Sequence, residues 1–464
     1  MKSFFNLRSL KIASLIGLKF TRRHIAYFLL GAVIVSALIF AQFKFNLFYS
    51  KNSIRIGLVG TYQEHDLPEE VTKLVSASLV LPDKNNRIKP NLVSGWETNN
   101  DATVFKFKLK DNLKWEDGSK IISSDLEFPI PDVDVSYPDD KTIQFKLKDS
   151  YSPFPSLLNK PIFKKETLLG IGPYKIDKIE KSRIFITKIT LTPIDPKLPV
   201  IYVRFYPNEK VAQTGFALGE VEVLLGITNP KALTSNPKVA IKQRVDYTKI
   251  VTVLYSMADN LVGGKNRSLR QAFSFIAPQI KEEEVADSPY PPFSWGYDST
   301  AKKYLNNQDE AKAALERAKA QMNSDQLHGE IILTATPNLE DVGKQIILAW
   351  KSLGFDAKLR IESGIPQNFQ SLLITQSIPT DPDQYFLWHA TQTKTNIAKV
   401  DVKRIDKDLE DGRKIISEDD RKLKYFDFQK ALLEEAPAIF LYFPKYTIVY
   451  LKKSELILNK ILGL

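Results

Sequence analysis

The side chains that most often perform catalysis or bind metals are few in this 464-residue sequence, and they are widely spaced. The four histidines, His24, His65, His328 and His389, show no H-E-x-x-H or similar ligand spacing. The absence of cysteine excludes disulfides, thiolate metal sites and a cysteine nucleophile. A lone histidine in such a sequence is more often a surface or packed residue than a ligand. We therefore expect no metal site.

Other patterns fall short of a catalytic motif. Residues 263–265 (GGK) do not form a phosphate loop, because Asp259 holds the distal glycine position and no serine or threonine follows. Residues 406–412 resemble a calcium loop, but the glycine comes one position late, and a solvated helix start is the alternative. No G-x-S-x-G is present. We expect neither an enzyme nor a cofactor. Carboxylate pairs without an evident partner remain, namely Asp132 with Asp134 and Asp381 with Asp383.

The net charge of +11 does not indicate a nucleic-acid-binding protein, because it is concentrated at one end of the chain. Residues 1–51 hold eight of the 65 lysines and arginines and no acid, which leaves 57 basic against 54 acidic residues in the remainder. A nearly balanced body offers no phosphate-binding surface. We expect no nucleic-acid partner.

The N-terminal region has the pattern of a membrane anchor. Residues 25–43 contain no charge, and nineteen residues at about 1.5 Å each span a hydrocarbon core. Six lysines and arginines precede them, so residues 1–24 are predicted to form a basic cytoplasmic leader, which either lies along the inner membrane surface or is disordered. A cleaved signal peptide is the alternative, but residues 39–41 (IFA) match a cleavage site poorly. We predict a retained single-pass anchor with the body on the extracellular or periplasmic face.

Strand and helix patterns alternate through the body. Apolar and polar residues alternate with a period of two in the predicted strands, and apolar residues recur at helical spacing in the predicted helices. The expected strands are 53–59, 105–110, 142–147, 184–192, 330–334 and 355–361, and the expected helices are 69–79, 308–322, 338–353 and 421–437.

One stretch of about 35 residues allows the chain to be compared with a known family. It contains PNLVSGWE at 90–97, FKFKLKDNLKWEDG at 105–118 and SSD at 123–125. The residue types and their spacing resemble the family 5 extracellular solute-binding proteins, the peptide- and nickel-binding components of ABC importers. Similar matches recur, with gaps, from about residue 53 to 450, including those at 170–176, 289–298 and 421–441.

This resemblance implies a two-lobe α/β fold like that of periplasmic binding proteins (type II, peptide-binding subclass), with a hinged cleft and, here, one N-terminal transmembrane helix. Lobe one is expected at 53–246, completed by 436–464, and lobe two at 250–435. A subdomain of lobe one, at about 85–165, is expected to be reduced. The reason is that only about fourteen residues, 126–139, stand where the family usually has several tens, including a long helix.

The resemblance also suggests where a ligand binds. Residues 371–388 resemble the family's ligand motif, with Asp381 before a proline as its marker, for which we expect a structural role in a turn. In peptide-binding relatives an aspartate three positions earlier pairs with the peptide's α-amino group, and here that position holds Ile378. A buried ammonium without a counter-charge is costly, so recognition of a free peptide N-terminus at this place is not expected.

Four further positions complete the predicted binding region. The backbone near Ile374 and Gln376 is expected to pair with a bound strand, because the relatives pair with their peptides around this segment. Trp295 and Trp388 are candidates to line the cleft, although tryptophan at such positions is more often packed in a core.

The function implied by the resemblance is capture of an oligopeptide-like or other small solute and its delivery to the permease and ATPase subunits of an ABC transporter. The alternative is a tethered scaffold or sensor outside transport, with a vestigial cleft. The shortened segment 126–139 and Ile378 favour this alternative.

Overall fold

The computed structural model describes residues 52–259, 266–304, 306–322 and 329–462, together with Tyr27, Leu30, Gly31, Val35 and Ser36. The predicted leader 1–24 and the rest of the predicted anchor 25–43 lie outside these residues. Within the described part of the chain, no helix is long and apolar enough to cross a membrane.

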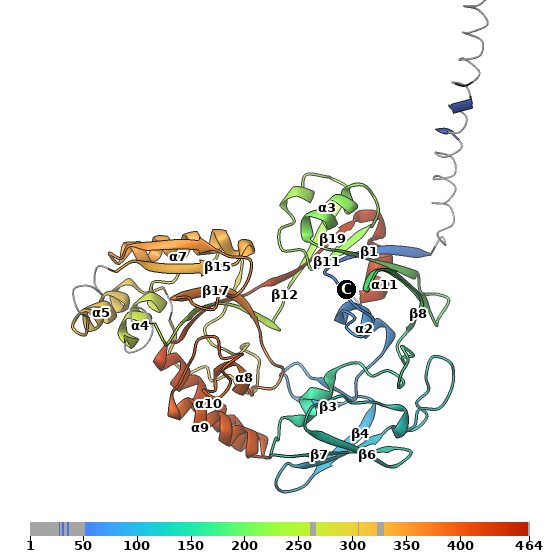
Figure 1. Cartoon of the computed structure of the whole chain (residues 1–464), viewed down its shortest axis with the longest axis horizontal. Helices are drawn as coiled ribbons and strands as arrows, with labels where there is room; N and C mark the ends of the chain where they lie inside the picture. Colours follow the sequence, from blue (N-terminus) through green and yellow to red (C-terminus); the bar gives the residue numbers. More distant parts are fainter. Residues whose placement is uncertain are drawn as a thin grey trace, which may run out of the picture.

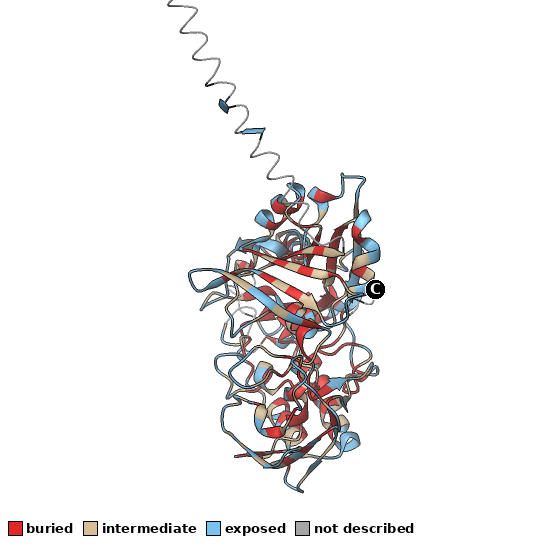
Figure 2. Ribbon diagram, turned by 90° about the vertical axis from the view of Figure 1, so that its right-hand side faces the viewer, coloured by how far each residue is buried: buried red, intermediate tan, exposed pale blue. Residues whose placement is uncertain are grey.

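The first lobe is built on a seven-stranded sheet in the order β12-β19-β11-β1-β10-β9-β8. Strand β1 occupies an inner position, because it pairs in parallel with β10 on one side and with β11 on the other. Helices α2 and α11 contribute to the core on one face, and α3 contributes to the core on the other. In Figure 2, which looks onto this side of the molecule, buried residues run along the strands. The elements are β1 (Ser53–Val59), α2 (Glu69–Val75), β8 (Tyr174–Ser182), β9 (Phe185–Pro193), β10 (Val200–Tyr206), α3 (Glu209–Ala217), β11 (Val223–Leu225), β12 (Val239–Val245), β19 (Lys445–Leu451) and α11 (Glu455–Leu462).

A smaller subdomain of the first lobe contains a four-stranded sheet, β4-β5-β7-β6, and the hairpin β2-β3. The predicted alternation in β5 is confirmed, since Phe105 and Phe107 are buried while the lysines between and after them are exposed. Residues 126–139 form the strand β6 and no helix. The elements are β2 (Val80–Pro82), β3 (Ile88–Pro90), β4 (Val93–Thr98), β5 (Val104–Leu109), η1 (Ser123–Asp125), β6 (Val133–Asp139), β7 (Thr142–Leu147) and η2 (Phe154–Asn159).

The second lobe is a six-stranded sheet, β14-β18-β13-β17-β15-β16, with helices on both faces. Helices α4, α5 and α7 pack on one face, where the rings of Trp350 and Phe273 stack with centroids 4.7 Å apart. Helices α8, α9 and α10 pack on the other. The elements are β13 (Lys249–Tyr255), α4 (Arg267–Phe275), β14 (Glu284–Val285), α5 (Gln308–Lys319), β15 (Ile331–Ala335), α7 (Glu340–Ser352), β16 (Ala357–Ile361), β17 (Ser371–Ser377), α8 (Tyr385–Trp388), α9 (Lys403–Lys414), α10 (Glu418–Glu435) and β18 (Ala438–Phe443).

The chain passes between the two lobes twice, at adjacent places (Figure 1). It leaves the first sheet after β12 and enters the second at β13, and it returns between β18 and β19 through Pro444. The Asp246 backbone N–H donates to the Pro444 carbonyl at 2.7 Å, which ties the two crossings together. The sequence placed residues 436–464 in the first lobe. Strand β18 instead pairs with β13 of the second lobe, so that expectation is wrong for β18. Only β19 and α11 complete the first lobe.

The predicted elements differ from the observed ones mainly at their ends. The strand at 53–59 agrees with β1, whereas the helix expected at 69–79 ends at Val75. Ser76 is extended there, and its buried hydroxyl donates to the Ile162 carbonyl of the neighbouring subdomain. The helix expected to start at Arg421 begins at Glu418, because Ser417 caps it.

We predict that a chain beginning at Asn52 is soluble and unfolds cooperatively, since it keeps β1 and the bonds of the Asn52 side chain to the carbonyls of Lys197 and Leu198. A chain beginning at Gly60 is the control. It lacks the strand that pairs with both β10 and β11, so it should not fold. Circular dichroism during thermal unfolding distinguishes the two. Aggregation of the Asn52 chain under all conditions would contradict the prediction.

Candidate functional site

Strand β17 is the element from which the candidate site is built. It pairs antiparallel with β13 along its whole length, from Ser371 to Ser377. Its parallel pairing with β15 stops at Leu373, opposite Ala335. In the described part of the chain, the backbone from Ile374 to Ser377 therefore has a strand on one side only. The open edge lies at the end of β17 that approaches the crossing, where the Ile378 N–H donates to the Thr248 carbonyl at 2.8 Å.

The side chains on this part of β17 are mostly buried. Ile374 packs in the core beneath α8, α9 and α10. Gln376 is 9% exposed, and its Oε1 accepts a hydrogen bond from the Thr252 hydroxyl at 3.0 Å. Ile378 is half-buried and packs beside Ile250. What β17 offers at its edge is therefore backbone, with no charged side chain at these three positions.

The two candidate tryptophans belong to the core of the second lobe. Trp388 is 2% exposed, and its indole N–H donates to Gln384 at 2.8 Å. Trp295 is 6% exposed, and its ring lies edge-on to that of Tyr425. Neither ring presents a face to a cleft in this structure. The backbone N–H of Trp295, however, donates to the Asn85 carbonyl of the first lobe at 3.2 Å.

Asp381 forms a buried ion pair that the sequence did not indicate. Its Oδ1 lies 2.6 Å from Nη2 of Arg421 on α10, and both side chains are 8% exposed. The same oxygen accepts the Asp383 N–H at 3.0 Å, and Arg421 Nε donates to the Gly412 carbonyl at 3.1 Å. Burial disfavours the charged guanidinium, but the interactions of Arg421 with Asp381 and Tyr425 together outweigh this effect and raise the pKa of Arg421. Because its charge is matched inside the lobe, Asp381 is not free to bind a ligand cation.

A second acid on the same loop, Asp383, is paired less closely. Its Oδ2 lies 3.3 Å from Nε of Arg413 on α9, and its Oδ1 accepts the Tyr385 N–H at 3.2 Å. Burial raises the pKa of Asp383 to about 6, although the charge of Arg413 acts in the opposite direction. The two acids of the predicted ligand motif thus have separate arginine partners, one on each of two neighbouring helices.

Arg413 also joins the two lobes. Its guanidinium lies between two tyrosine rings, 4.5 Å from the centroid of Tyr151 in the first lobe and 4.2 Å from that of Tyr385 in the second. The ring of Tyr385 stacks in turn on His389, with centroids 4.0 Å apart. The Ser152 N–H donates to the Arg413 carbonyl at 2.7 Å. A continuous stack therefore runs across the interface between the lobes.

Further contacts between the lobes flank this stack. Arg87, in the β2–β3 hairpin, forms an ion pair of 2.5 Å with Glu418 at the start of α10. Asn159 donates to the Thr380 hydroxyl at 3.4 Å, close to the end of β17. The subdomain of the first lobe that carries β2 to β7 is thus the part that touches the second lobe beside the ligand motif.

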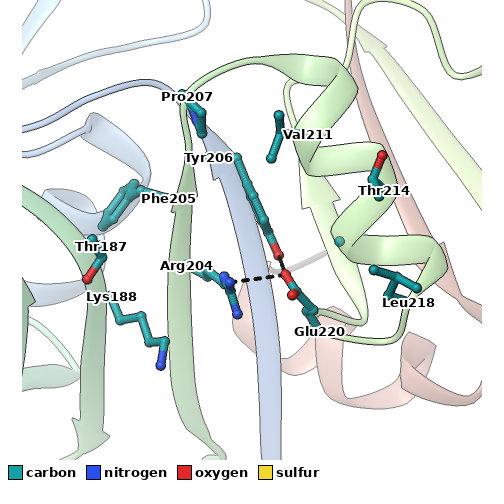
Figure 3. A pocket seen from close by; sticks show the side chains of 11 residues that line it. Thr187, Lys188, Arg204, Phe205, Tyr206, Pro207, Val211, Thr214, Leu218 and Glu220 are labelled. Atoms are coloured by element: carbon teal, nitrogen blue, oxygen red, sulfur yellow. Dashed lines mark hydrogen bonds and ion pairs between the residues drawn. The ribbon is translucent and has the colours of Figure 1, made fainter. Parts of the chain in front are cut away.

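A hollow of about 290 Å³ lies elsewhere, on the first lobe between β9, β10 and α3 (Figure 3). Its polar groups pair with one another, since the Tyr206 hydroxyl donates to Glu220 at 3.0 Å and Arg204 lies 3.2 Å from the same carboxylate. It belongs to the first sheet and its helix, away from β17 and the crossings. Among the described residues, no group of three or more histidine, cysteine, aspartate or glutamate side chains is placed to hold a metal ion.

Sequence reasoning missed most of the residues that surround the motif. Arg421 and Tyr425 lie in the stretch 421–441, which resembles the family. The sequence predicted a helix there, but no contact between these residues and Asp381. Tyr151 follows the strand predicted at 142–147, and nothing in the sequence indicated a contact with Arg413. Arg413 had no signal, because an arginine near the C-terminal end of a polar helix is ordinary.

The chain matches the family model described as bacterial extracellular solute-binding proteins, family 5 middle, over residues 129–397. It is 21% identical over 433 residues to the probable D,D-dipeptide-binding periplasmic protein DdpA of Escherichia coli K12, covering 79% of this chain and 81% of that protein. It is 22% identical over 460 residues to the oligopeptide-binding protein AppA of Bacillus subtilis 168, with 82% and 83% covered.

Among solved structures, NikZ from Campylobacter jejuni, in complex with Ni(L-His), superposes with a TM-score of 0.69 at 20% identity. The alignment covers 87% of this chain and 94% of NikZ. This similarity supports the two-lobe α/β fold of periplasmic binding proteins that the sequence predicted.

The buried pair leads to a stability prediction. Asp381→Asn should lower the free energy of unfolding by about 3–5 kcal/mol, because it leaves Arg421 charged, buried and without its counter-ion. Lys424→Ala, also on α10, is the control. It removes a more exposed pair with Asp411 and should cost about 0–1 kcal/mol. Urea unfolding at pH 7 measures both, and equal losses would contradict the importance given to the buried pair.

Proposed function

The chain belongs to the bacterial extracellular solute-binding proteins of family 5, and from this membership we propose that it captures an oligopeptide-like solute between its lobes and delivers it to the permease and ATPase subunits of an ABC transporter. The names of two relatives support this ligand class, since one is called D,D-dipeptide-binding and the other oligopeptide-binding.

One observation carries the proposal: the open backbone edge of β17 from Ile374 to Ser377, beside the junction of the two lobes. An extended peptide that adds to such an edge gains main-chain hydrogen bonds whatever its sequence. The side chains at Ile374 and Gln376 are mostly buried, so they contribute little to selectivity there. Binding through the backbone suits a protein that accepts several related solutes.

Recognition of the peptide's N-terminus is proposed to differ from that in peptide-binding relatives. Ile378 stands where those relatives have an aspartate, and it is packed beside Ile250. The acids that follow, Asp381 and Asp383, already have Arg421 and Arg413 as partners. An ammonium group placed here would therefore lose its hydration without gaining a matched charge.

Closure of the lobes is the proposed means of capture. The two crossings lie side by side and act as a hinge, a known geometry for closing two lobes around a ligand. The stack of Tyr151, Arg413 and Tyr385 holds the reduced subdomain against the second lobe. This contact would break when the lobes separate.

The second candidate is a tethered scaffold or sensor whose cleft no longer binds a ligand. The short segment 126–139 favours it, because this segment contributes to one wall of the cleft in relatives and here forms only β6. Genes for a permease and an ATPase adjacent to this gene would favour transport, and their absence would favour the scaffold.

We also propose that residues 25–43 remain as a transmembrane anchor, with residues 1–24 in the cytoplasm and the body on the extracellular or periplasmic face. The uncharged run and the six preceding basic residues support this topology. A retained anchor would keep the binding protein at the membrane without the lipid-modified cysteine that this chain lacks.

Ligand binding should tolerate a blocked peptide N-terminus. Acetylation should change affinity little, because no carboxylate at position 378 pairs with the amine. In a relative that has the aspartate, the same block should cost about 3–5 kcal/mol, which is several hundredfold or more. Calorimetry with matched free and acetylated peptide libraries measures the difference.

The two ways in which this experiment can fail have different meanings. Tight binding that acetylation abolishes would show that an acid elsewhere in the chain pairs with the peptide amine. Absence of binding to either library would contradict capture of a peptide-like solute and favour the scaffold or sensor.

Retention of the anchor predicts a mature chain that still contains residues N-terminal to Phe43. Mass spectrometry of protein extracted from membranes of the native host measures its N-terminus directly. A mature chain that starts near Gln42 would show instead that the segment is a cleaved signal peptide, and the body would then need another means of attachment.

A further inference from the structure

Several strands of the first sheet begin or end at one edge of the sheet, next to Asn52. Strands β1, β10, β11 and β12 start at this edge, and β9 and β19 end at it. We name it the N-terminal edge. The crossings to the second lobe lie at the opposite ends of β12 and β19. The N-terminal edge therefore faces away from the lobe junction (Figure 1).

Four lysines lie at the N-terminal edge. Lys197 precedes β10, and its carbonyl accepts a hydrogen bond from Asn52. Lys452 follows β19 and donates its backbone N–H to the carbonyl of Lys238, which precedes β12. Lys453 pairs with Glu222 at 2.9 Å, whereas Lys197, Lys238 and Lys452 have no ion-pair partner within the described ranges. These three side chains are exposed.

Large apolar side chains project at the same edge. Leu456, in the first turn of α11, is 78% exposed. Ile194, directly after β9, is 51% exposed. Leu456 is the most exposed large apolar side chain of the described chain, and it lies in the turn that follows Lys452 and Lys453. Lysines mixed with exposed leucines are typical of surfaces that lie against lipid headgroups.

Basic residues outnumber acids at this edge. Glu222 lies between Arg55 and Lys453. Glu455 accepts a hydrogen bond from the Tyr450 hydroxyl, and Asp195 accepts the backbone N–H of Lys197, but a hydrogen bond from a neutral donor does not cancel a carboxylate charge. The basic side chains are Arg55, Lys197, Lys238, Lys452 and Lys453, and the acids are Asp195, Glu222 and Glu455, so the edge keeps a basic excess.

We propose that the N-terminal edge rests on the anionic headgroups of the membrane. The inference rests on the retained anchor proposed above. Residues 44–51 span at most about 30 Å when fully extended, so an anchor ending at Phe43 holds the edge within that distance of the bilayer. At such a distance the lysines gain from the negative surface potential, and Leu456 and Ile194 gain from leaving water.

The absence of cysteine makes this orientation measurable. The full-length chain, carrying a single fluorophore at Leu456→Cys or Ile194→Cys, is reconstituted in vesicles with nitroxide-labelled headgroups and about one third anionic lipid, a content at which the surface potential is strong. Leu348→Cys on α7 and Leu423→Cys on α10 are matched controls, with 68% and 61% of the leucine exposed. We expect quenching at the first two positions and little at the controls.

Charge variants test the cause of the contact. The triple variant Lys197→Gln, Lys238→Gln, Lys452→Gln should lose most of the quenching at Leu456→Cys, since each lysine near an anionic surface contributes roughly fivefold in affinity. The control variant Lys106→Gln, Lys108→Gln, Lys146→Gln changes three exposed lysines of the subdomain and should keep it. Zwitterionic vesicles or high salt should weaken the quenching in the unaltered chain.

Flotation of the vesicles separates failure of the anchor from failure of the contact. A chain that floats with the bilayer but shows equal quenching at Leu456→Cys and Leu348→Cys would overturn the contact alone. A chain that does not float would contradict the retained anchor and the contact together. Equal quenching in the two triple variants would show that the lysines do not hold the edge to lipid, which also overturns the proposal.

Discussion

Buried charge is the constraint on which the candidate site depends. The loop after β17 carries Asp381 and Asp383 into the interior, and a buried carboxylate without a partner is costly. The two partners, Arg421 and Arg413, come from the neighbouring helices α10 and α9. Pairing therefore fixes the positions of both helices relative to the loop, and the same helices cover the core around Trp388. The charges and the apolar core thus specify one arrangement of this half of the second lobe.

Arg413 connects this internal arrangement to the contact between the lobes, and the strength of that contact suits a hinge. A guanidinium over a tyrosine ring contributes about 0.5–2 kcal/mol, a backbone hydrogen bond about 1 kcal/mol, and an exposed ion pair such as that of Arg87 with Glu418 about 0–1 kcal/mol. Together they amount to a few kcal/mol. In the proposed closure, such a difference would favour the closed arrangement and still let the lobes open to admit a ligand.

The sequence allowed much of the fold to be predicted, because strand alternation and family-like stretches both lie in regular elements. The strand predicted at 53–59 coincides with β1, and the predicted alternation of apolar and basic residues is found in β5. The assignment of β18 to the first lobe failed, because its six apolar and aromatic residues read the same in either sheet and only pairing with β13 decides. The partners of Asp381 and Asp383 could not be predicted, since the contacts join residues 30 to 40 positions apart through tertiary packing.

The crossings to the second lobe lie at one end of the first sheet, and the N-terminal edge lies at the other. At one end, Pro444 alone separates β18 of one sheet from β19 of the other, and its bond to Asp246 keeps the two crossings in register. In the proposed hinge, bending would be confined to residues 246–248 and 444. At the other end lies the N-terminal edge, across the full length of β12 and β19. If that edge is held at the membrane, opening the hinge moves the second lobe and leaves the first in place. The open edge of β17 belongs to the moving lobe, so capture of a ligand and attachment to the membrane need not disturb each other.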